Sequence, residues 1–167
     1  MPKASDAPYD GLYQVAYVTN DFERALEQFG DTHGIAQFMQ LPKMRYGTGP
    51  GREAVCNIAL AYVGAIEIEV IEPLEGDVQL YRDYLPADGK FAVRHHHLSR
   101  LFDSREALEG QIAAYRAQGR AVPIDGSSVG GGARYFYADY RAELGHYMEG
   151  IHYEADARAF LASIPRF

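Results

Sequence analysis

The feature that most constrains this chain is a pattern of secondary structure that occurs twice. The segment 11–18, "GLYQVAYV", alternates as a strand does, and 19–34 places apolar residues at helical spacing after Asn20 or Asp21 as N-cap. A Gly/Pro loop is predicted over 42–53. The first half thus predicts a strand, a helix and three further strands, over 11–18, 19–34, 35–41, 54–63 and 65–73.

The same order returns in the second half of the chain. A strand, a helix capped by Asp103 or Ser104, and three strands are predicted over 93–102, 103–119, 121–128, 133–140 and 145–153, followed by a C-terminal helix. An internal repeat fixes an architecture more firmly than any single element does. The chain is accordingly divided into an arm 1–10, a first module 11–74, a linker 75–92, a second module 93–152 and a C-terminal helix 153–167.

The two halves can be superimposed in sequence. When Gln14 is set over His97, Asp21 falls over Ser104, so the two predicted helix caps coincide. Further pairs are Val18 over Leu101 and Glu23 over Glu106, with one residue of slip inside the helix. The sequence identity between the two halves is low, but the predicted strand ends and helix starts fall at equivalent positions.

Composition narrows the classes of partner. The 167 residues carry a net charge of −7, which argues against binding to nucleic acid or to an anionic membrane. The N-terminal stretch is polar and lacks a signal-peptide pattern, and no apolar run approaches the ~18 residues of a membrane span. The single cysteine, Cys56, fits a reducing cytoplasm and is expected to be a buried, inert thiol.

Each half offers one polar residue on its first strand and one carboxylate on its last. Gln14 and Glu69 are 55 positions apart, and His97 and Glu149 are 52 apart. Pairing the halves about a pseudo-twofold axis would bring the four side chains together. Two carboxylates, an imidazole and an amide oxygen suit Zn²⁺, Ni²⁺, Co²⁺, Mn²⁺ or Mg²⁺.

With these residues in place, the sequence resembles the vicinal oxygen chelate superfamily, which contains glyoxalase I, methylmalonyl-CoA epimerase, extradiol dioxygenases and bleomycin-resistance proteins. The resemblance covers about residues 11–152 and depends on four motifs in order, "YQVAYVTNDFERAL", "IEIEVIEPLEG", "HHHLSRLFDS" and "ELGHYMEG". It implies an α+β fold of two βαβββ modules, whose curved mixed sheet surrounds a metal cleft. It also implies a homodimer and metal ligands at Gln14, Glu69, His97 and Glu149.

Several neighbours compete with these residues or extend the site. Glu67 shares a strand face with Glu69 by period two and is the rival candidate, and both could simply face solvent. By the same alternation, His95 and Ser99 share the face of His97, while His96 points away. The candidates for contact with a substrate are His95, Ser99, Tyr135, Tyr137 and Tyr147.

The resemblance implies an enzyme that stabilises an enolate with a divalent metal. Glu149 is the first candidate for the base that moves the proton, with Glu69 or Glu67 on the opposite side of the cleft. We therefore expect an isomerase, epimerase or lyase for a small carbonyl compound, and the aromatic composition favours an apolar one. The alternatives are a binding protein of the bleomycin-resistance type and an extradiol dioxygenase, which Gln14 disfavours because that chemistry prefers two His and one carboxylate.

Overall fold

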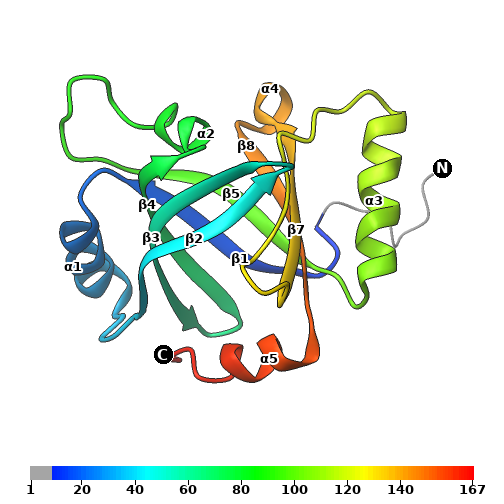
Figure 1. Cartoon of the computed structure of the whole chain (residues 1–167). Coiled ribbons are helices and arrows are strands. Elements are labelled where there is room, and N and C mark those ends of the chain that lie inside the picture. The colour runs from blue at the N-terminus through cyan, green and yellow to red at the C-terminus, as the bar shows by residue number, and fades with distance from the viewer. Residues whose placement is uncertain (1–8) are drawn as a thin grey trace.

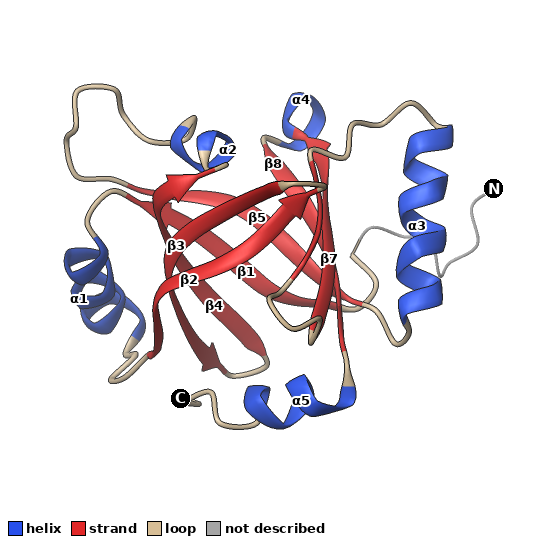
Figure 2. Cartoon of the chain, in the orientation of Figure 1, coloured by secondary structure: helices blue, strands red, loops and turns tan. Residues whose placement is uncertain are grey.

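Two βαβββ units follow each other in the computed structural model, which describes residues 9–167 (Figures 1 and 2). The first consists of β1 (Leu12–Thr19), α1 (Phe22–His33), β2 (Met39–Gly49), β3 (Arg52–Val63) and β4 (Ile66–Gly76). The second consists of β5 (Val93–Leu101), α3 (Arg105–Ala117), β6 (Ile124–Ser127), β7 (Ala133–Tyr140) and β8 (His146–Tyr153). Three short helices are α2 (Gln79–Arg82), α4 (Arg141–Leu144) and α5 (Ala155–Leu161). The predicted α+β class is confirmed, and most of the predicted arm lies outside the described residues.

The two long helices begin as the repeat predicts. Asp21 caps α1 by accepting a hydrogen bond from the Arg24 backbone at 3.3 Å, and Ser104 caps α3 by accepting one from Ala107 at 3.1 Å. Gly34 ends α1 with a φ of 70°, a conformation in which glycine carries no steric penalty. The equivalence of Asp21 and Ser104 is therefore structural as well as sequential.

The prediction of a loop over residues 42–53 is wrong. β2 continues through this segment to Gly49 and pairs with β3. Pro42, which cannot donate to a ladder, falls in a register shift where no such bond is required. The next residue, Lys43, has a φ of 51°, and its N–H is satisfied by the Asn57 side chain at 2.9 Å.

The eight strands of the described residues form one sheet in the order β2-β3-β4-β1-β5-β8-β7-β6. β1 and β5 pair antiparallel at the centre and join the two units. The outer strands β2 and β6 then approach each other, and the sheet is nearly closed into a barrel. A bridge between Tyr46 and Ser128 links this seam, and the Tyr135 hydroxyl donates to the Gly47 carbonyl at 2.8 Å.

Close approach of the two edges depends on glycine. A Cβ on Gly126 would overlap the Gly47 carbonyl oxygen, so only a residue without a side chain fits on β6 there. α1 and α3 cover the outside of the barrel on opposite sides (Figure 1). Each packs over its own apolar cluster, and a third cluster fills the interior.

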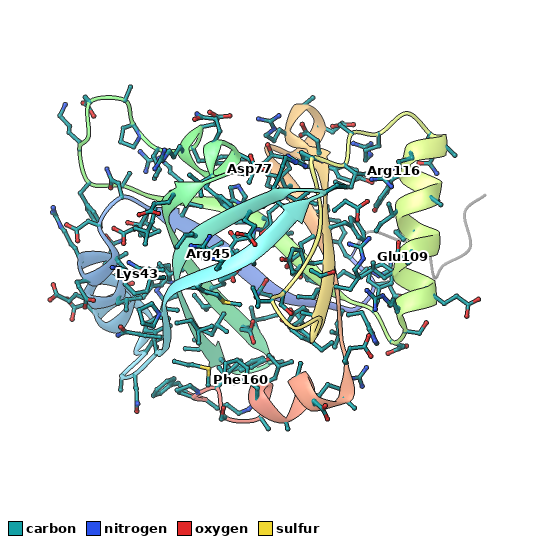
Figure 3. The ribbon with its side chains drawn as sticks, in the orientation of Figure 1. Lys43, Arg45, Asp77, Glu109, Arg116 and Phe160 are labelled. Carbon is teal, nitrogen blue, oxygen red and sulfur yellow. The ribbon has the colours of Figure 1, made fainter. Side chains whose placement is uncertain are left out.

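The two ends of the barrel are covered by short segments. α2 lies near one end and α5 near the other, where Figure 3 labels Phe160. The segment after α5 is attached to β3, because the Tyr62 N–H donates to the Pro165 carbonyl at 2.8 Å and the Phe167 N–H donates to the Tyr62 carbonyl at 2.9 Å. Across residues 9–167, no helix has the length and apolar character required to span a bilayer.

Candidate active site

The polar residues singled out in the sequence come from the four central strands of the sheet. Gln14 lies on β1, Glu69 on β4, His97 on β5 and Glu149 on β8. Ala16 pairs with both Glu69 and His97, so β1 sets the relative position of the two modules' residues. All of these residues belong to one chain, so no second chain is needed to assemble the set.

His97 is at the centre of this arrangement. Its side chain is fully buried, and its Nε2 lies 3.4 Å from Glu69 Oε2 and 3.5 Å from Glu149 Oε2. Burial alone would lower the pKa of His97, but the two carboxylates outweigh it and raise that pKa to about 9. The imidazole therefore carries a proton at neutral pH when only these side chains surround it.

Glu67 and Glu69 occupy different surroundings although they share a strand. Burial raises the pKa of Glu69, while the contact with His97 opposes that rise. Burial also raises the pKa of Glu67, to about 7, against the lowering effect of a hydrogen bond that the Gln14 amide donates at 2.7 Å. Glu67 thus holds the amide of Gln14, and Gln14 Oε1 is left for another partner.

The donor set suits a divalent ion by its chemistry. Imidazole nitrogen, carboxylate oxygen and amide oxygen all bind Zn²⁺ or a similar ion. Gln14 Oε1 is buried and has no hydrogen-bond partner among the described residues, and His97 Nε2 faces the two carboxylates, so both atoms are placed to bind an ion that replaces the imidazole proton. In residues 9–167, however, no group of three or more His, Cys, Asp or Glu side chains already has the arrangement of a metal site.

The prediction that His96 points away from His97 is wrong. Ala16 pairs with His97 while Tyr17 pairs with His95, so His96 is the extra residue of a β-bulge and the period-two alternation fails there. The His95 ring consequently packs against Tyr17 and His146, outside the set described above. The predicted contact of His95 with a substrate is not favoured by this position.

His96 is a direct neighbour of His97 that the sequence did not reveal. Its Nδ1 lies 2.9 Å from His97 Nδ1, and its Nε2 lies 3.4 Å from the Leu80 carbonyl, to which it can donate. Burial, together with the neighbouring His97, lowers the pKa of His96 well below its usual range, so it stays neutral. A neutral His96 accepts the Nδ1–H of His97 and thereby directs His97 Nε2 toward the carboxylates.

A cavity of about 340 Å³ adjoins the carboxylates. Gln14, Glu69 and Glu149 form its polar wall. The remaining lining is mostly apolar or aromatic: Leu41, Met44, Tyr46, Ile58, Leu60, Ile71, Tyr81, Ser128, Val129, Gly132, Ala133, Tyr135, Tyr137, Ile151, Tyr153, Ala157, Phe160 and Leu161. Ala157, Phe160 and Leu161 belong to α5, so this helix forms part of the wall.

The other predicted substrate contacts divide into two groups. Tyr135 and Tyr137 line the cavity. Ser99 is buried opposite Gln14 and is not part of the cavity lining. Tyr147 is buried next to Tyr137, with ring centroids 6.1 Å apart, and does not line the cavity either. Tyr46 and Tyr81 were missed, because the first stood in a predicted loop and the second in a predicted linker.

Comparisons with known proteins can now be set beside this geometry. The profile of the glyoxalase/bleomycin resistance protein/dioxygenase superfamily matches residues 13–137. Curated proteins give no match. Among solved structures, methylmalonyl-CoA epimerase from Mycobacterium tuberculosis superimposes with a TM-score of 0.57 and 14% identity, covering 89% of this chain and 91% of that one.

Two further structures give similar values. A Streptomyces coelicolor methylmalonyl-CoA epimerase in complex with 2-nitronate-propionyl-CoA has a TM-score of 0.58 and 15% identity, over 87% of this chain and 99% of that one. A hypothetical protein from Bacillus halodurans has a TM-score of 0.56 and 17% identity, over 86% and 94%. At such identities the likeness establishes a shared fold. With the profile match across most of its length, the chain belongs to the glyoxalase/bleomycin resistance protein/dioxygenase superfamily, the vicinal oxygen chelate superfamily.

Proposed function

We propose that this protein is a divalent-metal-dependent epimerase or isomerase that moves a proton on the carbon next to a carbonyl group. The observation that carries the proposal is the meeting of Glu69 and Glu149, one from each module, at a single imidazole nitrogen of His97. The carboxylates also line the cavity, so a substrate there would be within reach of both.

The residues that would hold the metal are His97 through Nε2, Glu69, Glu149 and Gln14 through Oε1. Such an ion supplies stabilisation of the negative charge that develops on the carbonyl oxygen as the proton leaves. Glu67 contributes by fixing the Gln14 amide at 2.7 Å, and His96 by fixing the ring of His97.

Glu149 is the proposed base, and Glu69 is the group that returns a proton from the other module. Two carboxylates from different strands permit removal of the proton from one face of the carbon and return of a proton to the other face of the planar enolate. This inverts the configuration at that carbon. The surrounding wall is mostly apolar and would limit contact of water with the reacting carbon. Support for the reaction class comes from the neighbours that are methylmalonyl-CoA epimerases, one of them in complex with methylmalonyl-CoA.

The first experiment measures bound metal in protein purified without a histidine tag. We expect about one divalent ion per chain in the wild type, lost in His97→Ala and in Glu149→Ala. His33→Ala is the matched control, since His33 lies exposed in the last turn of α1. A wild type that takes up no ion from a Zn²⁺, Ni²⁺, Co²⁺, Mn²⁺ and Mg²⁺ series would contradict the proposal and favour the binding-protein alternative.

The second experiment tests proton transfer directly. Ketones, aldehydes and methylmalonyl-CoA are incubated with enzyme in deuterated water, and exchange at the carbon beside the carbonyl is followed by NMR. Exchange should depend on the metal and be lost in Glu149→Gln, which keeps the shape but not the base. Full exchange in Glu149→Gln would assign the proton transfer to another residue, and oxygen consumption with a catechol would support a dioxygenase instead.

A further inference from the structure

A chain of hydrogen-bonded side chains crosses the interior of the barrel beside the cavity. The Tyr46 hydroxyl lies 3.3 Å from Cys56 Sγ and donates to the Tyr81 hydroxyl at 2.8 Å. Tyr81 in turn donates to the Tyr137 hydroxyl at 3.3 Å. The three tyrosines come from β2, α2 and β7, so the chain joins both modules and the segment between them.

The donors in this series of tyrosines all point the same way, which leaves the hydroxyl hydrogen of the last tyrosine without an acceptor in residues 9–167. Each phenol has a single O–H to donate, and those of Tyr46 and Tyr81 are used along the chain. Within the described part of the protein, the Tyr137 hydroxyl accepts from Tyr81 and donates to nothing. A hydroxyl that already accepts a hydrogen bond is polarised and donates a stronger one. The Tyr137 hydroxyl is therefore a strengthened donor with no acceptor of its own among the described residues.

Tyr137 stands next to the groups assigned to proton transfer. It pairs with Glu149 across β7 and β8, and its ring lies against the ring of His97 with centroids 4.7 Å apart. Tyr137 also lines the cavity, as do Tyr46 and Tyr81. A molecule in the cavity with an oxygen at this point would accept a hydrogen bond from the Tyr137 hydroxyl while lying beside the carboxylates.

The wall of the cavity restricts what such a molecule can be. Within residues 9–167, the lining of the cavity contains no lysine, arginine or histidine, and its acidic residues are Glu69 and Glu149. In the metal-free protein the cation beside these carboxylates is the His97 imidazolium, which they already pair, so a phosphate or carboxylate placed inside would find no unpaired cation in the lining. The volume of about 340 Å³ is at the low end of the ~300–1,000 Å³ range of ligand pockets, and the closed seam between β2 and β6 limits extension sideways.

We propose that the cavity accepts a compact, uncharged and largely apolar ketone or aldehyde, whose oxygen accepts a hydrogen bond from the Tyr137 hydroxyl. Tyr81 and Tyr46 are positioning residues that hold and polarise this donor. The inference specifies the substrate class of the proposed function and rests on that function for its relevance to catalysis. The binding that it describes needs neither metal nor turnover.

The test uses two probes of nearly equal shape, 1-indanone and indane, of which only the first has a carbonyl oxygen. Their affinities for metal-free protein are measured by titration calorimetry. We expect 1-indanone to bind the wild type about tenfold more tightly than indane, the equivalent of one well-formed hydrogen bond. Tyr137→Phe should abolish this preference while leaving the affinity for indane unchanged, which shows an intact cavity.

Tyr81→Phe should reduce the preference by roughly two- to threefold, because Tyr137 then loses the bond that polarises it. Tyr115→Phe is the control, since Tyr115 is buried in the apolar cluster under α3 and should leave both affinities unchanged. Equal binding of the two probes, survival of the preference in Tyr137→Phe, or binding of neither probe would each overturn the proposal. If these results hold while metal binding and deuterium exchange fail, the recognition of carbonyl compounds stands and the proposed catalysis does not.

Discussion

Glu67 offers a sharp test of the electrostatics of this site, through the substitution Glu67→Gln. The carboxyl is fully buried, and burial together with Glu69 raises its pKa from 4.5 to about 7. The variant keeps an oxygen that accepts from Gln14, and its new amide nitrogen replaces Oε2. The substitution therefore removes the charge with little change in shape.

The sign of the effect follows from which state holds the proton. Below pH 4.5 both states are protonated, and as the pH rises the unfolded chain loses its proton first while the folded protein keeps it until about pH 7. The unfolded state binds fewer protons across this window, so the free energy of unfolding falls with rising pH. A pKa difference of roughly 2.5 corresponds to a loss of about 3 kcal/mol, which Glu67→Gln should not show.

The assay is urea denaturation of metal-free protein at intervals from pH 4 to 8, followed by circular dichroism. The comparison concerns the slope of stability against pH, so a constant cost of the buried amide does not affect it. His97 and Glu69 titrate in both proteins, and the difference between the two curves isolates Glu67. Glu75→Gln, exposed near the end of the same strand, should retain the wild-type slope. Parallel curves for wild type and Glu67→Gln would refute the reasoning.

Three further predictions concern other parts of the molecule. Zn²⁺ binding to His97, whose pKa is raised to about 9, must displace its proton, so calorimetry should find affinity rising roughly tenfold per pH unit between about pH 7 and 9; a flat profile would contradict this. Gly126→Ala should destabilise the protein by about 1–3 kcal/mol in urea because the new methyl meets the Gly47 carbonyl, whereas Gly110→Ala in the open face of α3 should not destabilise it. Ser104→Ala should cost about 1 kcal/mol through loss of the α3 cap, and an unchanged urea midpoint would show that the cap contributes nothing.

The repeat was predictable because its signals are local. Caps such as Asp21 and Ser104 act within four residues, and alternation along β4 placed Glu67 and Glu69 on one face. The spacing within the two halves predicted that Gln14, Glu69, His97 and Glu149 would lie together; in the structure Glu69 and Glu149 lie beside His97, while the Gln14 amide donates to Glu67. The pairing of β1 with β4 and β5 sets Glu69 and His97 on either side of Ala16.

The features of the site that could not be predicted depend on pairing between strands that are distant in the sequence. The bulge at His96 is set by the register of β5 on β1, about eighty residues away along the chain, and nothing in "HHH" marks it. The tyrosine chain was hidden for a similar reason. Tyr46 stands among Gly and Pro residues that resemble a loop, and Tyr81 lies in a short helix between modules, so their meeting with Tyr137 becomes visible only in three dimensions.

The covering of the cavity by α5 has a kinetic consequence. No residue of α5 is buried, and Phe160 is 46% exposed, so its opening should cost far less free energy than separating strands of the barrel. A ligand's rate of exchange would then follow the opening of α5, while its affinity is set at Tyr137 and the carboxylates. Residence time and selectivity would thus be controlled by separate segments, and mutations in α5 could alter one without the other.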